Sequence, residues 1–329
     1  MKRVCSPATR SGLLALALVA AGCSETLDAG YNHADGLLPV DQRNPIVLLN
    51  DGAYDNWSGE YAVLLANGGG APLAGIVVNA NGDWPDIQAN VSGYQQLLDA
   101  ARASGLQNLP DAPIASAEVP LVKPASGAIE DTTPNRSAGA TFIVDTAARL
   151  ALPHRPLVIA TGGALTDVAD AYLIDSSVAS RVVVVSSLGS VTSAGGGMGN
   201  PNGDRDPWAD FIVASRFTYV QVSAWYDQLT DVPTDRLADL PVNQLGSWIM
   251  AKQPNLWQWS PASDQVSVIA AGLPAFTTVV QSVSAGTLAA GATNGPDLMT
   301  DTSGPSVLVT ACDGAAATAQ FWKVLGTTH

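Results

Sequence analysis

One turn near the amino-terminal end concentrates polar side chains that can bind a ligand. Four of them follow a run of four apolar residues at 46–49: they are Asn50, Asp51, Asp55 and Asn56. The apolar run predicts a short buried strand, and apolar residues at helical spacing over 57–67 predict a helix after the turn. Open α/β sheets bind ligands where a strand ends and a helix begins. Asp55 or Asn56 can also simply cap the helix, but capping needs only one such residue.

Other polar segments follow predicted strands further along the chain. Three of them lie at 79–83, 163–167 and 312–313, and a polar loop at 200–207 adds a fourth. Because parallel strands end at one edge of a sheet, carboxylates far apart in sequence can converge there. Aspartate, asparagine and main-chain oxygens, without sulfur or imidazole, are the ligands that calcium takes. The pattern therefore predicts that Asp51 and Asp313 share a cation site at this edge.

The elements that must position these residues alternate between strand and helix from residue 45 onward. Apolar runs predict strands at 46–49, 74–78, 112–115, 156–160, 181–186, 218–222 and 307–310. Helical patterns lie at 57–67, 87–104, 138–150, 164–173 and 207–215, with a last one ending near 325. Strands that are apolar almost throughout are covered on both faces. We expect an α/β fold, a doubly wound and mostly parallel sheet with helices on both faces, over 45–329.

The middle of the chain has a different composition. Residues 189–205 are rich in glycine, serine and asparagine and predict a loop over the carboxyl edge of the sheet. A helical, loop-rich segment at 223–265 holds four tryptophans: Trp225, Trp248, Trp257 and Trp259. They could form a stacking wall for a sugar or a base, but packing against the sheet is the commoner use of such residues.

The amino terminus reads as a targeting segment. Basic residues precede an apolar run at 12–21 that is too short to span a bilayer. Small residues then lead to Cys23, an arrangement that resembles the lipobox of bacterial lipoproteins. We expect a signal peptide at 1–22, a lipidated Cys23 and a flexible tether at 23–44, which would anchor the domain to a bacterial membrane outside the cytoplasm. An ordinary secretory signal is the alternative.

Charge and cysteine content exclude other classes of protein. Removing residues 1–22 takes away three basic residues and no acidic one, which moves the formal charge from −14 to −17. With no basic stripe to neutralise phosphates, nucleic acid is not expected as a partner. Cys312 is the only cysteine left after the signal and Cys23, so no disulfide forms within the mature chain. Stability must come from an ordinary core, which 47% hydrophobic residues can supply.

Three motifs together resemble the nucleoside hydrolase family, the inosine–uridine-preferring nucleoside N-ribohydrolases. The family run Asp-Thr-Asp-Pro-Gly-x-Asp-Asp-Ala is similar to 49–57, Leu-Asn-Asp-Gly-Ala-Tyr-Asp-Asn-Trp. Gly-Pro-Leu-Thr-Asn-Leu-Ala is similar to 163–169, Gly-Ala-Leu-Thr-Asp-Val-Ala. Glu-Phe-Asn-x-x-x-Asp-Pro-x-Ala-Ala is similar to 200–209, Asn-Pro-Asn-Gly-Asp-Arg-Asp-Pro-Trp-Ala. The resemblance covers roughly 44–325 and implies the fold of that family.

The resemblance also implies roles for individual residues. Asp51 matches the carboxylate that binds calcium and takes a proton from the attacking water. The other metal positions match Asn56, the backbone carbonyl of Thr166, and Asp313. Positions that hold ribose match Asp55 and Asn202, with Asn81 near a third. The implied partner is a small nucleoside or a related riboside, and family members often form dimers or tetramers, so a homo-oligomer is possible.

The sequence departs from the family at four of these positions. Leu49 and Asn56 replace aspartates, Asn200 replaces a glutamate that binds ribose, and Cys312 stands where many members have histidine. Asn56 keeps an oxygen ligand but removes one negative charge at the metal. A pair of unit charges about 4 Å apart interacts by ~4 kcal/mol at an effective dielectric of about 20, so calcium binding would weaken.

Three functions follow as hypotheses. The first is a calcium-dependent hydrolase that cleaves the N-glycosidic bond of nucleosides or related N-ribosides. The second is a surface lipoprotein that binds a nucleoside or ribose with a degenerate, inactive site. The third is a cell-surface scaffold with a dead pocket.

Overall fold

The computed structural model describes residues 43–51, 72–80, 86–116, 119–187, 201–222, 238–252, 277–293, 295–312, 322–323 and 325–328. All of them belong to one compact unit, Asn32–His329. The proposed signal and lipidation segment and the helix expected at 57–67 lie outside the described residues. Within the described part, no helix combines the length and the apolar character needed to cross a bilayer.

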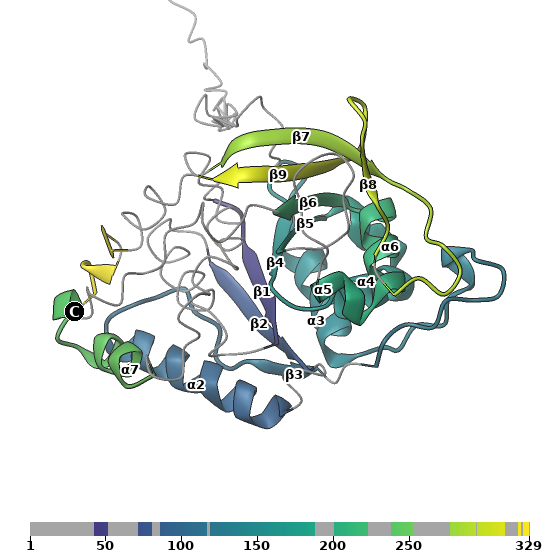
Figure 1. The fold of residues 1–329 in the computed structure, drawn as a ribbon. Helices are drawn as coiled ribbons and strands as arrows, with labels where there is room; N and C mark the ends of the chain where they lie inside the picture. The colour runs from purple at the N-terminus through teal and green to yellow at the C-terminus, as the bar shows by residue number, and fades with distance from the viewer. Residues whose placement is uncertain are drawn as a thin grey trace, which may run out of the picture. The chain divides into compact units, whose positions relative to one another are not determined.

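A single nine-stranded sheet organises this unit, in the order β3-β2-β1-β4-β5-β6-β9-β7-β8 (Figure 1). The strands are β1 (Ile46–Asn50), β2 (Leu73–Asn79), β3 (Ile114–Ser116), β4 (Leu157–Thr161), β5 (Val182–Ser187), β6 (Thr218–Val222), β7 (Thr277–Ala285), β8 (Leu298–Thr300) and β9 (Ser306–Cys312). Neighbours from β3 to β9 pair in parallel, whereas β7 is antiparallel to both β9 and β8. The seven parallel strands therefore end at the same edge.

The helices form two groups. The described α-helices are α2 (Ile87–Ala103), α3 (Ala138–Leu150), α4 (Thr166–Ile174), α5 (Pro201–Arg205), α6 (Pro207–Arg216) and α7 (Gln244–Lys252), with short 3-10 turns at Ile129–Asp131 and Ser176–Ser180. Helix α4 contacts α3 and α6, and α2 contacts α7. Both groups pack on strands, α3 and α6 in the first and α2 in the second.

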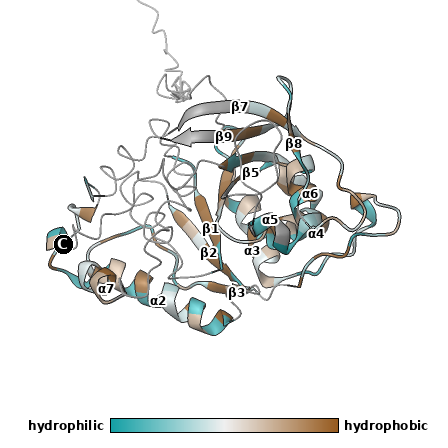
Figure 2. Cartoon of the chain, in the orientation of Figure 1, coloured by the Kyte–Doolittle hydropathy of each residue, from teal (hydrophilic) through white to brown (hydrophobic). Residues whose placement is uncertain are grey.

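Successive side chains along each strand point to opposite faces of the sheet. Val47 and Leu49 of β1 join the core cluster that includes residues of α3, α4 and α6, while Ile46 and Leu48 are equally buried outside that cluster. Since side chains alternate along a strand, both faces of β1 are covered. Figure 2 shows β1 and β2 as hydrophobic bands. This confirms the predicted α/β architecture with a sheet buried on both sides.

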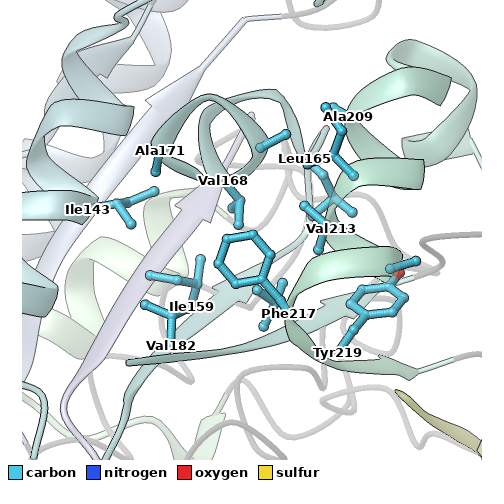
Figure 3. Packing of buried hydrophobic residues seen from close by; sticks show 14 of the residues in the cluster. Ile143, Ile159, Leu165, Val168, Ala171, Val182, Ala209, Val213, Phe217 and Tyr219 are labelled. Atoms are coloured by element: carbon cyan, nitrogen blue, oxygen red, sulfur yellow. The ribbon is translucent and has the colours of Figure 1, made fainter. Parts of the chain in front are cut away.

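Phe217 lies near the centre of that cluster. It follows the last residue of α6 and is 2% exposed, among Val168, Ile159 and Val182 (Figure 3). Its ring meets Tyr172 edge to face, with 6.1 Å between the ring centroids. This contact joins the carboxyl-terminal ends of α4 and α6 inside the core.

The structure corrects the sequence prediction in two places. Strands β7 and β8 were not predicted, because Thr277–Ala285 shows neither a continuous apolar run nor a strict alternation, and β8 has only three residues. The loop expected over 189–205 is helical at its end, where α5 occupies Pro201–Arg205; residues 188–200 lie outside the described residues. Trp248, in α7, is buried, which supports core packing for this tryptophan; the other three lie outside the described residues.

Candidate active site

Asp51 lies at the carboxyl end of β1 and is completely buried. Its backbone N–H donates to the side-chain Oδ1 of the preceding Asn50 at 2.8 Å, which fixes the turn out of the strand. Its Oδ2 accepts a hydrogen bond of 3.0 Å from Nη1 of Arg205, forming an ion pair with a guanidinium that is 19% exposed. The guanidinium offsets the cost of burying the charge of this carboxylate.

Arg205 also connects Asp51 to Asn202. The same Nη1 atom donates to Oδ1 of Asn202, which lies three residues earlier on α5 and is buried. Residues three apart lie on one side of a helix, so a single turn presents both side chains to the end of β1. The structure thus brings two predicted site residues, Asp51 and Asn202, to one cation that the sequence analysis had not singled out.

Asp206 links three segments next to this ion pair. Its Oδ2 accepts from the hydroxyl of Thr166 at 2.8 Å and from the N–H of Leu121 at 2.9 Å. Its Oδ1 accepts from the N–H of Ala209 at 3.0 Å and so caps α6, with Pro207 in the first turn. Burial raises the pKa of Asp206, although these hydrogen bonds oppose the shift. Thr166 is therefore at the site, but the metal role of its carbonyl stays a prediction.

Asn79 ends β2 beside the motif at 163–169. It is fully buried, and its Nδ2 donates to the carbonyl of Ala164 at 3.2 Å. A Cβ on Gly163 would lie 2.8 Å from Oδ1 of Asn79, so the turn after β4 needs glycine here. Asn81, predicted to hold ribose, lies outside the described residues; Asn79 is the asparagine that the structure places at this strand end.

Two further buried carboxylates lie on α4. Oδ1 of Asp167 accepts from the hydroxyls of Ser116 and Ser137, at 2.7 Å and 2.5 Å. Asp170, one turn later, accepts from the N–H of Ser137 at 2.8 Å. Burial raises the pKa of Asp167, the two serines oppose the shift, and the charge of Asp170 adds to it. Because Ser137 is the N-cap of α3, this cluster joins α3 to α4.

The described residues of this site do not by themselves offer a place for a divalent cation. Oδ2 of Asp51 and Oδ1 of Asn202 both face the guanidinium of Arg205, which occupies the place between them. In the described part of the chain, no group of three or more histidine, cysteine or acidic side chains is placed to hold a metal ion.

Several predicted site residues lie outside the described residues: Asp55, Asn56, Asn81, Asn200 and Asp313. Cys312 ends β9, and its strand is separated from β1 by β4, β5 and β6. Strands β1 and β9 are four strand spacings apart, which is about 19 Å. Asp51 and Asp313 can share an ion only if the chain after β9 returns across most of this distance. Leu49, at a family aspartate position, points into the core and is fully buried.

Solved nucleoside hydrolases are similar to this chain in fold, at low sequence identity. No protein-family model and no curated protein matches the sequence. A solved inosine-uridine preferring nucleoside hydrolase from Bacillus anthracis has a TM-score of 0.60 at 12% identity, covering 86% of this chain and 99% of its own. A plant nucleoside hydrolase has a TM-score of 0.58 at 15% identity, covering 87% and 99%. A purine-preferring ribonucleoside hydrolase from Gardnerella vaginalis has 0.55 at 15%, covering 85% and 98%.

Proposed function

We propose that this protein hydrolyses the N-glycosidic bond of a nucleoside or a related N-riboside. The observation that carries the proposal is the buried carboxylate of Asp51 at the carboxyl end of β1, next to Asn202. The solved structures of similar fold are named as nucleoside hydrolases, and the three sequence motifs resemble that family.

In this reaction Asp51 accepts a proton from water while the water oxygen attacks the anomeric carbon. The carbon–nitrogen bond breaks, its electron pair remains on the base nitrogen, and that nitrogen takes up a proton. The amide of Asn202, with Asp55 and Asn81 from their predicted positions, holds ribose hydroxyls whose contacts strengthen as the sugar gains oxocarbenium character. Arg205 orients Asp51 through the 3.0 Å hydrogen bond.

The protonation of the leaving base has no assigned residue. His154, the one histidine in the described part of the chain, is exposed in the turn after α3. Cys312 is a weak donor.

Calcium remains a prediction from the family resemblance. It depends on Asn56 and Asp313, which lie outside the described residues, and the described oxygen atoms face Arg205. No step above therefore passes through a metal.

The test is release of free base from a panel of purine and pyrimidine nucleosides by the full chain, with calcium and with a chelator. Asp51→Asn should lower the rate at least ~10²-fold, as expected for loss of a general base. Asp111→Asn, at an exposed position, is the matched control and should leave the rate unchanged. A folded protein that releases no base from any nucleoside contradicts the proposal.

A nucleoside- or ribose-binding protein without turnover is the second candidate. The ion pair favours it, because a guanidinium bonded to Oδ2 of Asp51 competes with water for that oxygen. This function predicts a higher melting temperature with nucleoside or ribose and no product.

The location is also proposed from the sequence. A signal at 1–22 and lipidation of Cys23 would place the domain outside the cytoplasm on a bacterial membrane. Association into a homo-oligomer stays a prediction, to be checked by light scattering.

A further inference from the structure

We infer that Arg205 is a built-in cation that takes the place of a divalent metal ion beside Asp51. The inference deepens the proposed function, and its consequences for turnover rest on that function. The arrangement of Arg205 with Asp51 and Asn202 does not depend on that function.

Two oxygen atoms converge on one nitrogen of Arg205. Nη1 donates to Oδ2 of Asp51 at 3.0 Å and also to Oδ1 of Asn202. A carboxylate oxygen and an amide oxygen directed at one positive centre are what a hard cation would use as ligands. Here the positive centre belongs to the chain itself.

The charge balance at the site supports this reading. Asp51 is completely buried, and the guanidinium that pairs with it is 19% exposed. Burying a charged carboxylate is costly, and here the guanidinium of Arg205 supplies the charge that offsets this cost. A divalent ion would have to displace the guanidinium or bind next to it, and like charges a few ångströms apart repel strongly in a buried site.

The position of Arg205 is fixed by the residues around it. It is the last residue of α5, and the next residue, Asp206, is held by Leu121, Thr166 and Ala209 through hydrogen bonds of 2.8–3.0 Å. The side chain of Arg205 also donates a hydrogen bond to Asn202 in the same turn. The turn that carries the guanidinium is therefore held in place by hydrogen bonds to Asp206. As a result, riboside binding should not require a divalent cation.

The experiment titrates calcium into the full chain by calorimetry. We expect no saturable binding for the natural chain up to about 1 mM, the weak end of the range for extracellular calcium sites. Arg205→Met removes the charge and keeps the apolar stem, and it should bind calcium at least ~100-fold more tightly. Arg205→Lys keeps the charge and should behave like the natural chain.

The role of Asp51 is checked by the double variant Asp51→Asn/Arg205→Met. It should lose the calcium binding that Arg205→Met gains, because the carboxylate is then absent. Calcium binding by the natural chain at micromolar concentration overturns the inference, and so does equal affinity in the natural chain and a folded Arg205→Met variant. If Arg205→Met does not fold, Arg205→Gln replaces it, and the titration of the natural chain still decides.

Turnover is measured separately. Base release that a chelator does not reduce agrees with the inference, whereas release abolished by a chelator and restored by calcium contradicts it. If no nucleoside is cleaved, the proposed function fails while the calcium titrations still test the role of Arg205.

Discussion

The hydroxyl of Thr166 donates a hydrogen bond of 2.8 Å to Oδ2 of Asp206, and this bond joins the first turn of α4 to the start of α6. The two residues belong to two of the three motifs that resemble nucleoside hydrolases. Since Arg205 directly precedes Asp206, the bond also braces the turn that carries the guanidinium to Asp51. Residues with no assigned contact to substrate thus support the site through their hydrogen bonds.

Replacing Asp206 with alanine should therefore destabilise the protein strongly. The change removes the acceptor for Thr166 and Ala209 and leaves the buried N–H of Leu121 unpaired. We expect a loss of about 2–4 kcal/mol in the free energy of unfolding, measured by urea denaturation. Asp86→Ala removes a matched but exposed N-cap, on α2, and should cost about 1 kcal/mol or less. Equal losses in the two variants would contradict the bracing role.

Asp167→Asn should stabilise the protein at neutral pH. Burial raises the pKa of Asp167 in the folded state, so the folded protein binds more protons than the unfolded chain above the ordinary aspartate pKa. Stability therefore falls as pH rises through the folded pKa of this group. Asparagine keeps Oδ1 as acceptor for Ser116 and Ser137 and removes the charge. We expect a higher free energy of unfolding at pH 7 than in the natural chain, because the charged carboxylate no longer has to be buried.

The measurement for Asp167 is the free energy of unfolding from pH 4 to pH 8, which should fall less steeply in the variant. Asp175→Asn is the control with the opposite sign: hydrogen bonds from Ser177 lower the pKa of this exposed group, so its contribution is lost as pH falls. Parallel pH profiles for the natural chain and Asp167→Asn would refute the assignment.

Gly163→Ala should disturb Asn79. The new methyl group would lie 2.8 Å from Oδ1 of Asn79 and force it from the carbonyl of Ala164. We expect a cost of about 1–3 kcal/mol in stability. In an Asn79→Ala background, Gly163→Ala should lower the free energy of unfolding clearly less, because the contact with Oδ1 is absent. A double-mutant cycle measures this difference between the two backgrounds. Additive effects would show that Asn79 does not set the requirement for glycine.

Cys23→Ser tests the proposed lipid anchor. If Cys23 is lipidated, the substitution should move the protein from the membrane fraction to the soluble fraction, because the acyl chains supply the membrane affinity. Mass spectrometry of the amino-terminal peptide checks the modification directly. A natural chain whose mature terminus carries an unmodified Cys23 would favour the ordinary secretory signal.

The strands predicted most accurately were those with continuous apolar runs. The pattern at 46–49 became β1 with one further residue, and the four valines of β5 lie in a strand covered on both faces. Helix α3 has the predicted bounds because Ser137 caps its first turn. These signals are local, so they survive without knowledge of the fold. Strand β7 carries neither an apolar run nor a strict alternation, and its pairing with β9 and β8 defines it as a strand.

The sequence by itself determined the layered α/β architecture, the polar turn at Asp51 and the placement of Asn202 in a motif, because apolar runs, caps and short spacings record local preferences. Only the tertiary structure decided which cation stands at Asp51. Arg205 is 154 residues away in sequence, and nothing in the chain between them indicates the pairing. The order of parallel strands brings the two together, and it also separates β1 from β9 by three strands. Residue types near a strand end show what a site can bind, but the path of the chain decides which charges meet there.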